Sequence, residues 1–213
     1  MPEFKIFEQG IQARWLRNRL AVPKLIPMNP VVVRYHLLAR LLHALLALLL
    51  VGMFAVGLYM ADLPFSPLRL KLYNWHKWAG VVVLTLSLVR LLWRLASPPP
   101  ALPATVSNAM APWQRRAHGA AHLGLYVLFF SVPLLGWAYS SASGFPLVVF
   151  GVWPLPDWVP VNETLAGLLK PAHRYAAYAL AGLVVIHMVA ALKHHFVDRD
   201  GLLSRMGFGR VRA

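Results

Sequence analysis

The sequence predicts an all-α integral membrane protein, built as a four-helix bundle with both termini in the cytoplasm. Three observations support this prediction. The 213 residues are 59% hydrophobic and only 13% charged, whereas about a quarter of the residues in a soluble domain are charged. Four stretches stay apolar over the roughly 20 residues that a helix needs to cross a bilayer. Lys and Arg are concentrated in the segments that lie on one side of these stretches.

The first segment, residues 1–33, is expected to be a basic extension. No secretory signal peptide is expected there, because the first long apolar run begins only near Leu37. The extension is compatible with a helix lying at the membrane interface or with a disordered basic arm. The helix would use apolar residues that recur at helical spacing, namely Phe4, Phe7, Ile11 and Trp15.

The second segment, residues 34–208, is expected to be the four-span domain, with residues 209–213 as a tail. Pro133 falls inside the third span, where neighbouring helices can satisfy the carbonyl group that a proline frees. The spans are predicted at about residues 35–60, 73–95, 113–140 and 170–196.

The two longer connections differ in character. Residues 97–112 are rich in proline and are expected not to be helical. Residues 141–169 include Trp153 and Trp158, which suit an aromatic belt at the outer membrane interface.

The orientation follows from the basic residues. Of the 21 Lys and Arg residues, 16 fall in the N-terminal segment, the connection between the second and third spans, or the C-terminal segment. The positive-inside rule therefore predicts that both termini are cytoplasmic. The net charge of +14 is interpreted as attraction to anionic lipid headgroups, and no nucleic-acid partner is expected because no binding motif accompanies it. The other five cations are Arg69, Lys71, Lys77, Lys170 and Arg174.

The chain has no cysteine and nine histidines. This composition excludes iron–sulfur clusters, thiolate-ligated haem and covalently attached c-type haem. Imidazole is therefore the candidate metal ligand.

Four histidines form two pairs by their depth in the predicted bundle. His173 and His187 are 14 residues apart, so they share a helix face and differ in depth by about 21 Å. His76 begins the second span at the level of His173, and His43 lies in the first span at the level of His187. Two haems bound between imidazole pairs would use all four side chains.

Other interpretations of these histidines remain. A single intramembrane histidine is often an interhelical hydrogen-bonding group. Zinc is a weaker alternative, because neither pair has a further carboxylate or thiolate ligand beside it. His194, His118 and His122 are candidates to contact a haem propionate or a quinone. The cations Lys71, Lys77, Lys170 and Arg174 could attract a small anion to the outer pair or could lie at the headgroup level.

Four segments of the chain resemble the prokaryotic cytochrome b561 family. They are RYHLLARLLHALLALLL, LYNWHKWAGVVVLTLSLVRLLWRL, AHLGLYVLFFSVPLLGW and LKPAHRYAAYALAGLVVIHMVAALKHHF, and the resemblance runs from about residue 33 to 208. It implies a multi-pass protein of the bacterial inner membrane with two haem b groups. The implied ligands of the haem iron are His43, His76, His173 and His187.

The resemblance also implies an activity. Proteins of this family oxidise periplasmic superoxide and reduce ubiquinone, and His194 falls where a histidine that contacts the quinone is expected. The leading hypothesis is therefore a superoxide:ubiquinone oxidoreductase. Related cytochromes serve as membrane subunits of hydrogenases and dehydrogenases, so an electron-transfer subunit that binds a redox protein partner is the second hypothesis. A haem-free membrane protein, such as a small transporter, is the third.

Overall fold

The computed structural model describes residues 34–102 and 104–207, and the structural statements below concern these residues. The predictions for residues 1–33 and for the tail at 209–213 fall outside them.

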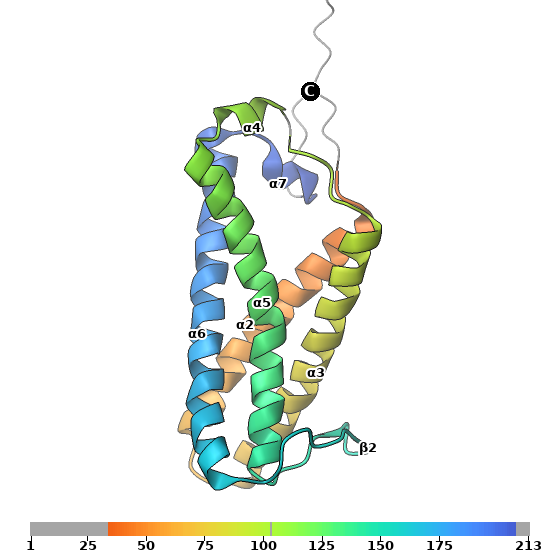
Figure 1. Cartoon of the computed structure of the whole chain (residues 1–213), viewed down its shortest axis with the longest axis vertical. Helices are drawn as coiled ribbons and strands as arrows, with labels where there is room; N and C mark the ends of the chain where they lie inside the picture. The colour runs from red at the N-terminus through yellow and green to blue at the C-terminus, as the bar shows by residue number, and fades with distance from the viewer. Residues whose placement is uncertain (1–33, 103, 208–213) are drawn as a thin grey trace, which may run out of the picture. The chain divides into compact units, whose positions relative to one another are not determined.

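Four long helices form the framework: α2 Leu37–Asp62, α3 Pro67–Ala96, α5 Pro112–Ala142 and α6 Glu163–Lys193. Helix α5 lies along α6, α2 packs on α3, and α3 also packs on α5 (Figure 1). Each of the four is long and apolar enough to cross a membrane. The predicted all-α, four-helix membrane bundle is therefore confirmed.

Short sequence signals determine where two of these helices begin. The hydroxyl of Ser66 accepts a hydrogen bond from the backbone N–H of Arg69 at 3.3 Å and caps α3. Asn162 caps α6 in the same way, accepting from Leu165 N at 2.9 Å. Because this cap precedes Glu163, α6 begins seven residues before the predicted start at residue 170 and continues through Pro171.

The connection between α3 and α5 corrects one prediction. A short helix, α4 Ala104–Ala109, lies inside the segment 97–112 that was expected not to be helical. The prolines of this segment flank the sequence ATVSNA and do not interrupt it, so a short helix can form between them.

The connection between α5 and α6 contains a small hairpin. Strand β1 Val148–Val149 pairs antiparallel with β2 Trp153–Pro154. The turn between them uses left-handed backbone at Phe150, with φ 53°, and at Gly151, with φ 75°.

The two ends of the bundle carry different elements. Helices α4 and α7, Leu202–Arg205, lie at one end, and the β1–β2 hairpin lies at the other (Figure 1); we call these the α7 end and the hairpin end. Arg205 is 3% exposed and donates to the carbonyls of Pro100 and Ala101 at 2.8 and 3.0 Å. Its own carbonyl accepts from Tyr35 N at 3.0 Å, so α7 is tied both to the α3–α5 connection and to the start of α2.

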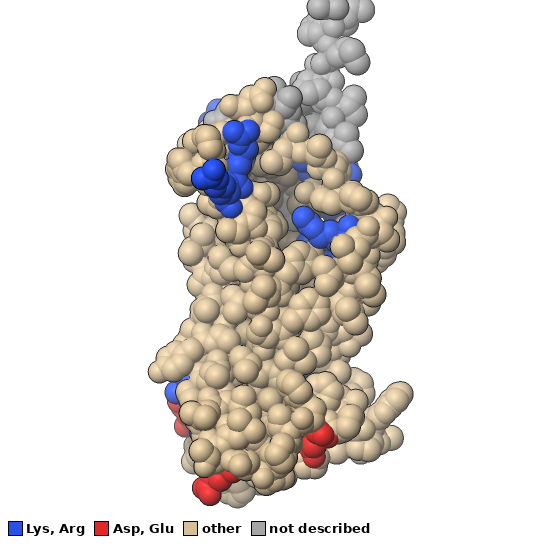
Figure 2. Space-filling model, viewed as in Figure 1, with Lys and Arg blue, Asp and Glu red and all other residues tan. Residues whose placement is uncertain are grey.

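The surface matches a membrane environment. Large apolar side chains point outward from the middle of the long helices, as Leu48 and Val127 do at 74% and 54% exposure. On the face drawn in Figure 2, Lys and Arg gather mainly toward the α7 end, Asp and Glu lie toward the hairpin end, and a wide uncharged band separates them. An apolar band of this kind is what lipid chains would cover.

Candidate functional site

The first candidate site lies toward the hairpin end. His76 on α3 and His173 on α6 face each other across the bundle, with ring centroids 6.2 Å apart and ring planes at 90°. The structure therefore brings together the two outer histidines that were predicted to pair.

Glycines on the other two helices make room for these rings. A Cβ atom added to Gly57 on α2 would lie 3.3 Å from Cε1 of His76, and one added to Gly136 on α5 would lie 3.0 Å from Cε1 of His173. All four long helices thus contribute to the site. Close approach of backbone to ring is a specific reason for glycine at these two positions.

The protonation pattern of His173 suits a metal ligand. Its Nδ1 lies 2.9 Å from the carbonyl oxygen of Val132. Because a carbonyl can only accept, Nδ1 donates, and Nε2 keeps its lone pair in the neutral ring. Ligating histidines commonly have this arrangement, in which the second ring nitrogen is held by a carbonyl group.

Several buried polar atoms near the bundle interior have no hydrogen-bond partner among the described residues. Such atoms are rare in folded proteins and point to a missing partner, such as a water molecule or a cofactor. The serines and the tryptophan among them were not predicted as site residues. The atoms are Nδ1 of His76, Oγ of Ser87, Nε1 of Trp137 and Oγ of Ser141.

The second candidate site lies toward the α7 end. His43 on α2 and His187 on α6 have ring centroids 6.4 Å apart, with the planes at 50°. This is the predicted inner pair. A third ring, that of His122 on α5, lies 5.3 Å from His187 and nearly perpendicular to it. On α3, Arg90 donates to the carbonyl of Ala39 at 3.0 Å, one turn before His43.

The ring separations fit an iron atom held between two imidazoles. A metal lies about 2 Å from a coordinating imidazole nitrogen, and the nitrogen is about 1 Å from its ring centre, so two ligands on opposite sides of one metal have ring centres roughly 6 Å apart. Both pairs have this separation. The residues present therefore fit two haem groups, one toward each end of the bundle.

The cations of the hairpin end have separate roles in the structure. Lys77, next to His76, donates to the carbonyls of Phe145 and Pro146 at 3.5 and 3.2 Å. Lys77 therefore holds the α5–α6 loop beside the outer pair. The ammonium of Lys71 lies 4.8 Å from the ring centre of Trp75. The remaining two candidates, Lys170 and Arg174, are exposed on α6.

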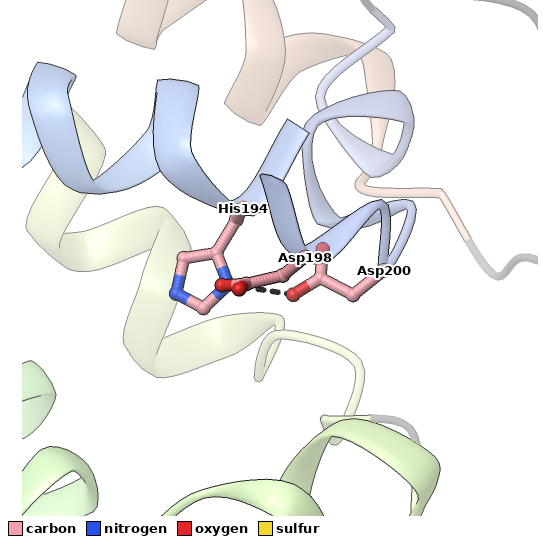
Figure 3. Close-up of side chains that lie close together, drawn as sticks. All are labelled: His194, Asp198 and Asp200. Carbon is pink, nitrogen blue, oxygen red and sulfur yellow. Dashed lines mark hydrogen bonds and ion pairs between the residues drawn. The ribbon is translucent and has the colours of Figure 1, made fainter. Parts of the chain in front are cut away.

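At the α7 end, α6 continues as one π-helical turn, η1 His194–Asp198, and brings His194 against two carboxylates (Figure 3). Nδ1 of His194 lies 2.6 Å from Oδ2 of Asp200 and 3.2 Å from Oδ2 of Asp198. His194 was a predicted site residue, and neither aspartate was. Asp198, four residues on, is a helical neighbour of His194, whereas Asp200, six residues on, reaches the ring only because the helix ends at Asp198.

His118 and His122 line a cavity of about 280 Å³ between α3 and α5, together with Arg94 and Tyr126. Nδ1 of His122 lies 2.8 Å from the carbonyl of His118, so it donates. The guanidinium of Arg94 lies 5.8 Å from the ring centre of Tyr126. A flat, polar-edged ring could enter a cavity of this composition, close to the inner pair.

Comparison with known proteins identifies a family and several relatives. The family model for prokaryotic cytochrome b561 matches residues 34–209. Cytochrome b561 homolog 2 of Escherichia coli K12 is 36% identical over 175 residues, which cover 81% of this chain and 90% of that protein. A probable superoxide oxidase, CybB of Yersinia pestis, is 31% identical over 134 residues, covering 62% of this chain and 72% of the relative. Cytochrome b561 homolog 1 of E. coli K12 is 32% identical over 140 residues.

Proposed function

The chain belongs to the prokaryotic cytochrome b561 family, and from this premise we propose that it is a di-haem superoxide:ubiquinone oxidoreductase. Membership makes it a multi-pass electron-transfer protein of the bacterial inner membrane that binds haem b. The proposal adds the number of haems, their ligands and the two substrates.

Two histidine pairs at different depths of one bundle are the observation that carries the proposal. His76 with His173, and His43 with His187, would each hold one iron. Bound haem would supply reversible one-electron transfer. The protein would keep both groups in a water-poor interior, between helices whose outward surfaces are apolar.

We assign the hairpin end to the periplasm and the α7 end to the cytoplasm. The supporting observation is the distribution of charge, with 16 of 21 Lys and Arg residues in segments expected on the α7 side. Superoxide would then meet the hairpin end. Lys71, Lys77, Lys170 and Arg174 would attract this small anion, because a positive field in a low-dielectric setting raises the local anion concentration.

Ubiquinone would be reduced at the α7 end. Two superoxide anions give one electron each and become dioxygen, and one ubiquinone takes both electrons together with two protons to become ubiquinol. Since superoxide delivers no protons, the protein must accept them from water on the quinone side. His194 would contact the quinone and pass protons to it.

The direct test mixes the purified haem-loaded protein with an enzymatic source of superoxide and a short-chain ubiquinone, and follows ubiquinol. We expect ubiquinol formation that superoxide dismutase abolishes. Ubiquinol at the level of the haem-free protein would contradict the proposed activity.

The alternative function is that of an electron-transfer subunit in a larger respiratory or dehydrogenase complex. The observation that favours it is that the family match begins at residue 34, which leaves residues 1–33 for another role such as docking. It predicts that a dehydrogenase or an oxidase co-purifies with the full chain and is lost when residues 1–30 are deleted. The absorption spectrum tests the third hypothesis, a haem-free membrane protein. A b-type α-band that appears on reduction would exclude it.

A further inference from the structure

The turn that ends α6 builds a histidine–aspartate pair with an unusual local geometry (Figure 3). A π-helical turn is rare and often occurs at functional sites. After it, Arg199 and Gly201 adopt left-handed backbone, with φ 51° and 74°, and reverse the chain direction. This reversal returns Asp200 to the ring of His194, whose side chain is 24% exposed, while that of Asp200 is 13% exposed.

The two aspartates beside His194 are not equivalent. Asp198 is 32% exposed and both of its carboxylate oxygens accept from Nζ of Lys193, at 2.8 and 2.7 Å. Asp200 instead directs Oδ2 to Nδ1 of His194 at 2.6 Å, while Oδ1 accepts the backbone N–H of Leu202 at 3.0 Å. Lys193 therefore neutralises Asp198, and Asp200 is the carboxylate that faces the histidine.

This contact determines which ring nitrogen is available. A carboxylate accepts, so Nδ1 of His194 carries the proton that it donates to Asp200, and Nε2 is the nitrogen left for another group. With its lone pair free, Nε2 can take up a proton and pass it on.

We propose that Asp200 is a positioning residue for proton transfer to the quinone, acting through His194. It holds the ring so that Nε2 faces away from the carboxylates. As the quinone is reduced, Nε2 takes a proton from water at the α7 end, and this Nε2–H bond breaks as an O–H bond forms on the quinone oxygen. Nδ1 keeps its hydrogen bond to Asp200 throughout. The inference rests on the proposed quinone reaction at His194.

Other charged groups also lie around His194. On its own segment these are Lys193, Asp198 and Asp200. From α5, His118 lies close enough to interact with His194 electrostatically, and His118 also interacts with Arg94 of α3. Asp200 makes the shortest of the contacts to the His194 ring.

The test isolates the quinone step from the superoxide step. Haem-loaded protein is reduced with dithionite, freed of excess reductant and mixed in a stopped-flow instrument with a short-chain ubiquinone, and the α-band reports reoxidation. Asp200→Asn is the informative variant, because the amide oxygen can still accept from Leu202 while the charge is lost. We expect reoxidation slower by about 10- to 100-fold, the usual effect of removing a partner that orients a functional histidine.

Matched variants separate positioning from general disturbance. Asp198→Asn should stay within about threefold of the wild type, because Lys193 holds that carboxylate in an exposed ion pair and it lies farther from Nδ1 of His194 than Asp200 does, at 3.2 Å against 2.6 Å. Asp200→Glu should recover part of the rate. In a His194→Gln background, Asp200→Asn should cause no further loss, since the two residues act as a unit.

Each outcome is decisive. Wild-type protein that quinone does not reoxidise would overturn the proposed quinone reaction and this inference with it. If the wild type reacts and Asp200→Asn keeps its rate, only the role of Asp200 is overturned. An equal loss in Asp198→Asn, or an additional loss of Asp200→Asn in the His194→Gln background, would likewise show that Asp200 does not act through His194. Haem content is measured for every variant. If Asp200→Asn loses haem, Asp200→Glu decides instead. Its rate of reoxidation by quinone must then exceed that of His194→Gln.

Discussion

At the scale of single residues, the histidines show how far spacing can locate a site. The interval of 14 residues between His173 and His187 gave their shared face and their difference in depth. The structure places the predicted partners opposite them, with centroids 6.2 and 6.4 Å apart. Spacing within a helix could not reveal His122 beside His187, because that proximity depends on how α5 packs against α6.

His122 makes the assignment of the inner pair testable. If His43 and His187 hold the inner haem, His187→Ala should remove about half of the reduced-minus-oxidised α-band, because one of two haems is lost. His122→Ala should keep both haems, since its ring lies beside that of His187 without completing the pair. The pyridine haemochrome assay measures haem per protein. Two haems retained in His187→Ala, or one lost in His122→Ala, would contradict the assignment.

Gly136 offers a second test, at the outer pair. In Gly136→Ala the new methyl group would lie 3.0 Å from the ring of His173, and this ring is already held by its hydrogen bond to the carbonyl of Val132. We expect the ring to tilt, which should alter the electron paramagnetic resonance signal of the outer haem or lower its occupancy. Gly52→Ala is the control, because its added Cβ meets nothing within 4 Å. Identical spectra for both variants and the wild type would exclude a close contact at Gly136.

At the scale of elements, apolar length predicts that a span exists better than it predicts where the helix ends. All four spans form, but α6 extends beyond its apolar stretch to Glu163 because Asn162 caps it there. The short α4 and the hairpin were not predicted. The hairpin depends on left-handed backbone at Phe150. Phenylalanine rarely adopts this conformation, so the sequence does not predict the turn.

The indole of Trp78 ties the hairpin to α3 next to the outer pair. Nε1 of Trp78, which lies two residues beyond His76, donates to the carbonyl of Val148 at 2.6 Å. Trp78→Phe should remove this bond and lower the free energy of local opening by about 1 kcal/mol. Hydrogen exchange of the peptide covering residues 147–155 should then speed up by about fivefold, while the helices keep their protection. Trp75→Phe is the matched control, because the Trp75 ring packs under Lys71 instead. Equal exchange in both variants would show that Trp78 does not anchor the hairpin.

At the scale of the whole molecule, composition and charge predicted the membrane environment, and the structure agrees. The long helices present apolar side chains outward, and an uncharged band separates the charged ends on the face drawn in Figure 2. Composition could not predict that Arg205 ties α7 to the α3–α5 connection at this end. A buried arginine that donates to the carbonyls of Pro100 and Ala101 looks in the sequence like one more basic residue of the C-terminal segment.

Orientation in the membrane is the remaining property of the whole molecule, and the absence of cysteine makes it directly measurable. Ser97, exposed at the end of α3, lies toward the α7 end, and Val152, 84% exposed in the hairpin turn, lies toward the other. With the α7 end in the cytoplasm, a membrane-impermeant maleimide should label Val152→Cys in spheroplasts and Ser97→Cys only in inverted vesicles. Leu48→Cys is the control: it is exposed in the middle of α2 and should resist labelling from both sides, because lipid covers it. The positive-inside rule acts through the cost of moving basic residues across the bilayer. Labelling of Ser97→Cys in spheroplasts would therefore place most of the basic residues on the periplasmic side, and superoxide and quinone could not then meet the ends proposed for them.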